Sequence, residues 1–84
     1  MAVQVRMFAA LRDAAGTGHA LVDPGPLPAL LEELSQRHGE LFRSRLAIST
    51  VLVDGSPCRA TDPVDVPDGA EVALLPPVSG GAGT

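Results

Sequence analysis

The residues best suited to chemistry stand near the end of the sequence, in the run Pro76-Pro77-Val78-Ser79-Gly80-Gly81-Ala82-Gly83-Thr84. Two prolines hold the backbone extended. Gly80 and Gly81 have no side chain that would obstruct entry into a narrow channel. At ~3.3 Å per residue, the seven residues from 78 to 84 span roughly 23 Å when stretched out. We therefore expect residues 78–84 to be a flexible tail that reaches into the active site of another protein.

A free carboxyl group on Gly81 would be suited to acyl activation. An α-carboxylate has a pKa of about 3.5, so it is ionised at neutral pH and can attack the α-phosphate of ATP to form a mixed anhydride. An internal peptide carbonyl cannot do this, so Ala82-Gly83-Thr84 would first have to be removed. The simpler alternative is that a glycine-rich end is an ordinary frayed terminus, and composition alone leaves that alternative open.

Composition limits the classes of protein that the chain can represent. Eighty-four residues suffice for one small domain. Six arginines, no lysine and ten carboxylates give a net charge of −4, and the only aromatic side chains are two phenylalanines. Such a chain lacks the positive charge and the stacking platform that nucleic-acid binding needs. The single Cys58 rules out an internal disulfide. We expect no membrane segment and a cytoplasmic location.

The tail must be carried by a folded body, and its first element is a strand over residues 2–8. Val3, Val5 and Met7 alternate with Gln4, Arg6 and Phe8, which predicts a strand buried on one face only. Residues 9–15 predict a short helical turn, and residues 19–22 predict a second strand.

The spacing then changes to that of a helix over residues 27–38. Its apolar stripe consists of Leu27, Leu30, Leu31, Leu34 and His38. Gly39 suits the position after the last turn, and His38 lies at the helix end where a cation is favoured. We expect Leu41, Phe42 and Leu46 to continue the core through a loop.

The second half of the chain predicts three more strands. Residues 48–53 lead into the hairpin turn Asp54-Gly55, and residues 57–60 predict a short return strand at an edge, because it begins with proline. Residues 61–68 are rich in turn formers. Residues 70–75 predict the last strand, with Val72 and Leu74 facing inward.

At this point the residues resemble a known family, the MoaD/ThiS sulfur carriers, and within it MoaD most of all. The resemblance covers residues 2–81 and rests on five stretches: Val5-Arg6-Met7-Phe8-Ala9-Ala10-Leu11-Arg12-Asp13-Ala14-Ala15-Gly16, Leu30-Leu31-Glu32-Glu33-Leu34, Val53-Asp54-Gly55, Asp68-Gly69-Ala70-Glu71-Val72 and Leu75-Pro76-Pro77-Val78-Ser79-Gly80-Gly81. It implies an α+β fold of the ubiquitin-like β-grasp type, with a mixed sheet of four or five strands and one main helix across it. The last strand would return to the middle of the sheet, in a parallel central pairing. The folded domain is then residues 1–77.

The resemblance also implies a function. The chain would be a carrier without catalytic side chains that binds no cofactor or metal. An E1-like enzyme would adenylate Gly81 with ATP, and sulfur transfer would make it a thiocarboxylate. Gly80, Ser79 and Val78 would give the tail access to the large subunit of molybdopterin synthase or to another sulfur-accepting enzyme. A peptidase would remove Ala82-Gly83-Thr84. Two alternatives remain: a carrier for another pathway (thiamine, cysteine or a thio-containing secondary metabolite), and a ubiquitin-like modifier or interaction module that carries no sulfur.

Outward-facing residues beside the tail predict a docking surface. It would consist of Arg6, Phe8, Leu75, Pro76 and Pro77. The alternative is that these residues have no function, because single exposed apolar residues are common.

We expect structural roles for the other residues of reactive type. Cys58 has no histidine or cationic cluster near it in sequence, and the two histidines lack metal-ligand spacing. The aspartates at positions 62, 65 and 68 predict a solvated turn rather than a Ca²⁺ loop.

Overall fold

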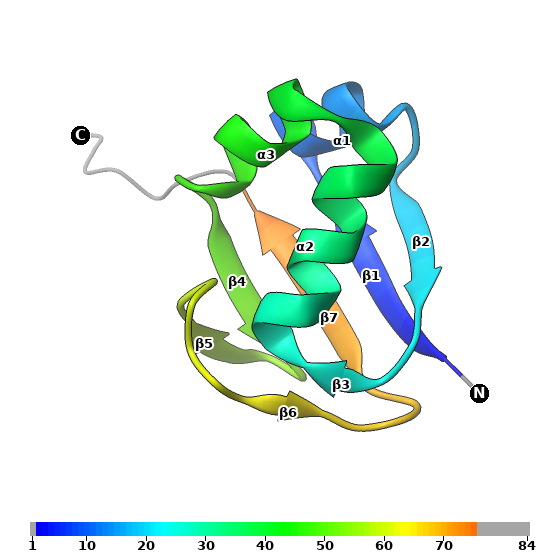
Figure 1. The fold of residues 1–84 in the computed structure, drawn as a ribbon, viewed down its shortest axis with the longest axis vertical. Coiled ribbons are helices and arrows are strands. Elements are labelled where there is room, and N and C mark those ends of the chain that lie inside the picture. Colours follow the sequence, from blue (N-terminus) through cyan, green and yellow to red (C-terminus); the bar gives the residue numbers. More distant parts are fainter. Residues whose placement is uncertain (1, 76–84) are drawn as a thin grey trace.

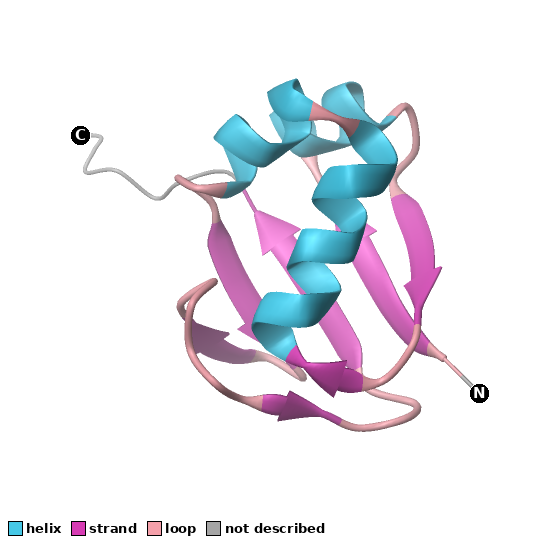
Figure 2. Cartoon of the chain, in the orientation of Figure 1, coloured by secondary structure: helices cyan, strands magenta, loops and turns pink. Residues whose placement is uncertain are grey.

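The computed structural model describes residues 2–75, in which a five-stranded sheet is covered by helices on one face (Figure 1, Figure 2). The strand order is β2-β1-β7-β4-β5. The strands are β1 (Val3–Met7), β2 (His19–Val22), β4 (Thr50–Val53), β5 (Ser56–Cys58) and β7 (Glu71–Leu75). β1 and β7 run parallel, and the other neighbouring pairs are antiparallel. The expectation that the last strand returns to the middle of the sheet is confirmed.

The two faces of the sheet follow the alternation in the sequence. In β1 the side chains at positions 3, 5 and 7 are fully buried, whereas Gln4 and Arg6 are exposed. In β7 Val72 and Leu74 are buried, as predicted. Because side chains alternate across a strand, these buried positions form one apolar face beneath the helices.

Helix α2 (Leu27–His38) crosses this apolar face and has the predicted bounds. All four of its stripe leucines are at most 4% exposed, so they supply one wall of the core. Pro28 stands in the first turn, where its missing N–H is not needed. Gly39 ends the helix with a φ of 100°, a conformation that costs glycine little. The short α1 (Ala9–Ala15) also matches its prediction.

A third helix replaces the predicted loop. α3 spans Glu40–Leu46, and it buries Phe42 and Leu46, which are four residues apart and therefore share a helix face. Leu41 was expected in the core but is 56% exposed, because it lies on the opposite side of this helix. The backbone reversal at Gly39 lets the second helix begin directly after the first.

The remaining differences concern strand ends. The strand predicted over 48–53 begins at Thr50, because a turn follows α3: the Ile48 N–H donates to the Arg45 carbonyl at 3.3 Å. The return strand is Ser56–Cys58, at the sheet edge as expected, rather than 57–60. The turn-rich residues 61–68 contain the short strand β6 (Asp65–Val66), which pairs with β3 (Gly25–Pro26) in a small two-stranded sheet.

Candidate functional site

The site is the end of the sheet at which β7 stops. Leu75 is the last described residue, and its backbone partner is Thr50 at the start of β4. On the other side of β7, the Phe8 N–H donates to the Leu74 carbonyl at 3.3 Å. The chain beyond position 75 therefore starts between the beginning of α1 and the beginning of β4 (Figure 1).

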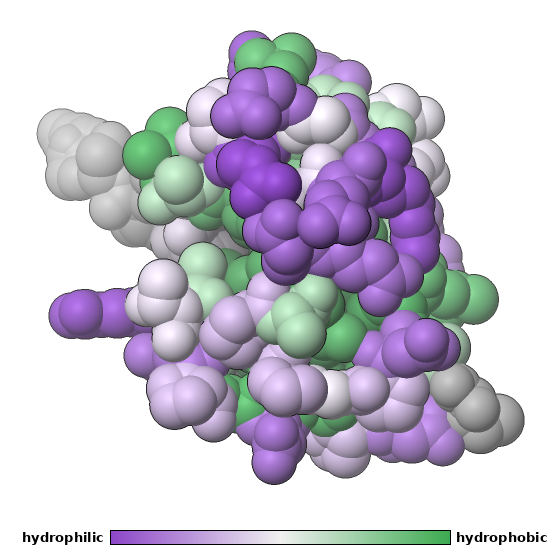
Figure 3. Space-filling model, viewed as in Figure 1, coloured by the Kyte–Doolittle hydropathy of each residue, from purple (hydrophilic) through white to green (hydrophobic). Residues whose placement is uncertain are grey.

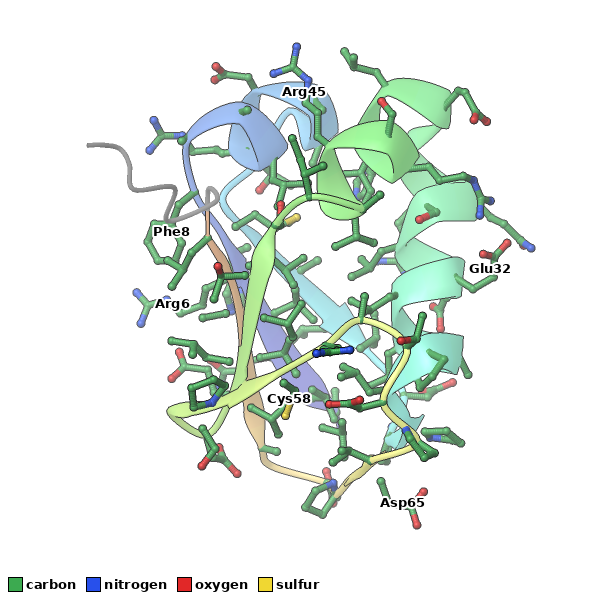
Figure 4. All side chains as sticks on the ribbon, turned by 90° about the vertical axis from the view of Figure 1, so that its left-hand side faces the viewer. Arg6, Phe8, Glu32, Arg45, Cys58 and Asp65 are labelled. Atoms are coloured by element: carbon green, nitrogen blue, oxygen red, sulfur yellow. The ribbon has the colours of Figure 1, made fainter. Side chains whose placement is uncertain are left out.

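Phe8 stands beside this exit because the backbone turns sharply after it. Ala9 has a φ of 50°, in the left-handed region, which costs a non-glycine residue roughly 1–2 kcal/mol. The turn begins α1, and the Phe8 carbonyl accepts the Leu11 N–H at 3.1 Å. The Phe8 side chain is 38% exposed. Figure 4 shows it, with Arg6, on the side of the sheet away from α2.

A polar row borders Phe8 on this open face. Arg6 Nη1 donates to Glu71 Oε2 at 3.2 Å across the β1–β7 pair. Nearer the β2 edge of the sheet, His19 Nε2 lies 3.4 Å from Gln4 Oε1. Both contacts are exposed to solvent, so they are screened and can exchange for contacts with another protein at low cost. The Arg6 guanidinium therefore lies on the same face as Phe8 and can leave Glu71 for a partner's acceptor.

The open face contains apolar positions that the sequence analysis did not include. Ala73, outward on β7, pairs with Leu52 of β4, and both are half-buried. Leu21 of β2 lies opposite Gln4 and is 54% exposed. Alternation within each strand could have indicated these side chains, but which of them lie next to one another depends on the strand register. Leu52, Ala73 and Leu75 form an apolar surface on β4 and β7, whereas Leu21 is separated from them by the polar outer side chains of β1.

Cys58 lies apart from the exit. Its side chain packs against the core from edge strand β5, and Figure 4 shows it well below Phe8. It lines a cavity of about 380 Å³ between β5 and the loop that follows α3. The thiol donates a weak hydrogen bond to the Ser56 carbonyl at 3.6 Å. This environment fits the structural role expected for Cys58.

His38 departs from the expectation of a favoured cation. Its ring lies 5.2 Å from the Phe42 ring, between α2 and α3. Nε2 is buried and has no hydrogen-bond partner among the described residues. Burial, and to a smaller extent the charge of Arg37, lower the pKa of His38. Here desolvation outweighs the attraction of the helix end for a cation.

The six residues predicted to form the arm and the reactive end lie outside the described residues. They are Pro76, Pro77, Val78, Ser79, Gly80 and Gly81. The predicted boundary between a domain over 1–77 and a tail over 78–84 also lies there. Of the predicted docking residues, the structure brings Arg6, Phe8 and Leu75 together at the exit.

Within 2–75, no three His, Cys, Asp or Glu side chains are grouped so that they could hold a metal ion. Asp62 instead accepts the Arg59 N–H at 2.9 Å, and Asp65 belongs to β6. None of the helices in this part of the chain has the length and apolar character that crossing a membrane requires.

Comparison with known proteins adds family information to this geometry. The sequence model of the ThiS family matches residues 5–81, almost the whole chain. No match is found among curated protein sequences.

Three solved structures show how widely the fold is shared. The first is small archaeal modifier protein 1 from Haloferax volcanii (27% identity, TM-score 0.76, 96% of this chain and 100% of that one). The second is a putative molybdopterin converting factor subunit 1 from Pyrococcus furiosus (26% identity, TM-score 0.77, 93% of this chain and 99% of that one). The third is a chain in a complex of subunits 1 and 2 of molybdopterin-converting factor from Helicobacter pylori (24% identity, TM-score 0.64, 96% of this chain and 100% of that one). At this identity the match shows only that the two chains share a fold. The ubiquitin-like β-grasp fold is thereby confirmed.

Proposed function

This chain belongs to the ThiS family of ubiquitin-like carrier proteins, and we propose that it carries sulfur for molybdopterin synthesis as a thiocarboxylate on Gly81. The observation that carries this proposal is the extent of the family match, which ends at Gly81 although three residues follow it. Members of this family are small carrier subunits rather than enzymes. The chemistry then belongs to the partners.

The proposed reaction begins with the release of Ala82-Gly83-Thr84 by a peptidase. The Gly81 carboxylate attacks the α-phosphorus of ATP in an E1-like enzyme, an O–P bond forms, and pyrophosphate leaves. Hydrosulfide released by the sulfur donor next attacks the acyl carbon, a C–S bond forms, and AMP leaves with one of the carboxyl oxygens, so that oxygen is replaced by sulfur. A side chain at the last position would crowd this attack, which supports a glycine there.

The open sheet face is the proposed docking surface for these partners. Phe8 and Leu75 flank the start of the tail, and Arg6 lies next to them. Pro76 and Pro77 would hold the following backbone extended as it enters the partner. Gly80, Ser79 and Val78 would occupy the channel. An apolar anchor with an exchangeable arginine beside it is typical of protein interfaces.

The accepting partner in this proposal is the large subunit of molybdopterin synthase. Support comes from the subunit 1–subunit 2 complex that includes a chain of the same fold and from the similarity to a putative subunit 1. Pull-down with the intact chain from its native host tests this assignment. Recovery of a thiamine- or cysteine-synthesising enzyme in place of the synthase subunit would move the carrier to another pathway.

Intact mass spectrometry tests the carrier chemistry. Two chains, one ending at Thr84 and one ending at Gly81, are incubated with the E1-like enzyme, ATP and a sulfur donor. We expect only the shorter chain to gain the mass difference between sulfur and oxygen, since only it has a carboxyl group on Gly81. If the shorter chain forms neither an adenylate nor a thiocarboxylate under conditions that load another carrier of the family, the proposal is wrong.

A protein modifier is the second candidate, because one of the similar structures is a small archaeal modifier protein. In that case Gly81 would form amide bonds to lysines of other proteins. ATP-dependent, higher-mass conjugates of the chain in a host lysate would favour this function. They would be lost in a Gly81→Ala variant of the chain.

A further inference from the structure

The end of the molecule that carries the tail has a second exposed feature, on α3. Leu41 is 56% exposed and Ile48 is 64% exposed, more than any other large apolar side chain among the described residues. The half-buried Arg45 lies four residues after Leu41 on α3, and Ile48 lies three residues after Arg45 in the turn that follows the helix, where its N–H donates to the Arg45 carbonyl. This helical spacing places the three on one side of the segment. Figure 3 shows apolar surface at the end of the molecule where α3 lies. We call these three residues the α3 strip.

The α3 strip runs toward the tail. Ile48 precedes Thr50 by two residues, and Thr50 is the backbone partner of Leu75. Phe8 lies on the other side of the same exit, and its backbone N–H donates a hydrogen bond to the Leu74 carbonyl. A partner that encloses the residues after Leu75 must therefore come close to both flanks, and the open sheet face provides only one of them.

The charge of this end differs from that of the rest of the chain. Helices α1 and α3 contain three arginines and two carboxylates, a net charge of +1, in a chain whose total is −4. Arg45 forms no ion pair with any residue in 2–75, whereas Arg43 is paired to Glu32 and Glu40. Figure 4 shows the Arg45 side chain at the end formed by these helices. An unpaired arginine between two exposed apolar side chains fits an acidic, apolar-edged surface.

We propose that the α3 strip binds an acidic patch on the adenylating enzyme, beside the channel that receives the tail. The inference rests on the proposed carrier function and adds a second contact to it. The carrier is then held on both flanks of the exit, by Phe8 on one side and by the α3 strip on the other. Two contacts on either side of a threaded chain fix its direction, which brings the terminal glycine to the α-phosphorus of ATP.

The test compares two charge reversals in the full chain. Arg45→Glu alters the strip, and Arg59→Glu alters an exposed arginine in the β5–β6 loop that also forms no ion pair with residues 2–75. Both change the net charge equally, so general electrostatic steering changes equally. We expect Arg45→Glu to weaken binding to the adenylating enzyme about tenfold or more, whereas Arg59→Glu changes it by less than about threefold.

Three further measurements separate the explanations. Ile48→Asp should weaken binding as Arg45→Glu does, and Arg45→Gln should reduce the salt dependence of binding while the melting temperature remains that of the wild type. Reversal of an acidic residue on the enzyme should restore binding of Arg45→Glu.

The proposed role of the α3 strip would be wrong if Arg45→Glu and Arg59→Glu bound the enzyme equally well. Normal thiocarboxylation of the wild-type chain cut after Gly81 would in that case leave the carrier function intact. A wild-type chain that the enzyme neither binds nor activates would overturn both.

Discussion

The two faces of the sheet use the same strands for different purposes. On the inner face Val5, Val72 and Leu74 are at most 1% exposed beneath α2. On the outer face Arg6, which follows Val5 in β1, and Phe8, whose N–H donates to the Leu74 carbonyl, are exposed. The inner side chains are fixed by packing, because a closely packed core tolerates little change in volume. The outer side chains have no such packing around them, so we expect them to matter less for folding, and the exposed apolar ring of Phe8 points to contact with another protein.

If this division is correct, fold and binding can be changed separately by mutating adjacent residues. Leu74 and Leu75 are the most direct pair, because consecutive residues of β7 point to opposite faces.

The largest effect is expected on stability at the inner face. Leu74→Ala should lower the free energy of unfolding by about 3 kcal/mol, since it leaves a cavity in a fully buried position. Leu75→Ala, the matched control on the outer face, should cost less than about 1 kcal/mol. Urea unfolding measures both. Similar losses for the two variants would show that the outer face is also part of the core.

The second effect is expected on binding at the outer face. Phe8→Asp should weaken binding of the adenylating enzyme by about thirtyfold, because it replaces an apolar anchor at the tail exit with a charge. Thr61→Asp places the same charge on an exposed loop residue and should bind as the wild type does. Calorimetric titration measures affinity, and circular dichroism checks the fold. Unfolding of Phe8→Asp would place Phe8 with the core instead.

The helical layer allows the same comparison between inside and outside. On the inside His38 packs on Phe42, and burial lowers the pKa of its imidazole below 6.5. The imidazole then binds a proton more readily in the unfolded chain than in the folded one. The stabilisation that neutral His38 provides is therefore complete above pH 6.5 and declines as the pH falls below it. His38→Leu should make stability depend less on pH in this range, measured by urea unfolding from pH 8 to pH 5. His19→Leu, on the open face, is the control and should keep the wild-type decline.

On the outside Glu32 joins the same two helices through Arg43, with two contacts of 2.7 and 2.9 Å. This ion pair, with a smaller contribution from Gln36, lowers the pKa of Glu32 from 4.5 to about 2. Its stabilisation is therefore present above pH 4.5 and is lost as the pH falls toward 2. Glu32→Gln should give a smaller loss of stability across that range.

This effect should be the smallest of the four, because the pair is exposed and salt screens it. Glu33→Gln changes a carboxylate whose partner, Arg37, lies within α2 itself, so it serves as the control. An acid transition that is the same in both variants would show that the α2–α3 pair does not hold the helices together.

The sequence predicted the inner face well because burial there is periodic. The alternation of β1 and the leucine stripe of α2 each extend over several repeats, and both elements have the predicted faces. The parallel pairing of β1 with β7 was expected from the family resemblance, since spacing within a strand contains no information on its neighbour.

The parts that were missed are short or depend on register. α3 has only seven residues, of which two are buried, so its pattern was too brief to distinguish a helix from a loop. β3 and β6 have two residues each and show no periodicity. Leu52 joins the outer apolar surface only because β4 pairs with β7 in this register.

The parallel alignment of β1 and β7 also has a practical consequence. Both strands start at the same end of the sheet, so Val3, the first residue of β1, and Leu75, the last residue of β7, lie at opposite ends of the domain. A fluorophore, affinity handle or surface linker attached ahead of Val3 would point away from any protein that grips the glycines. Single-molecule or immobilised assays of carrier loading can therefore be built on this chain without blocking the event that they are meant to observe.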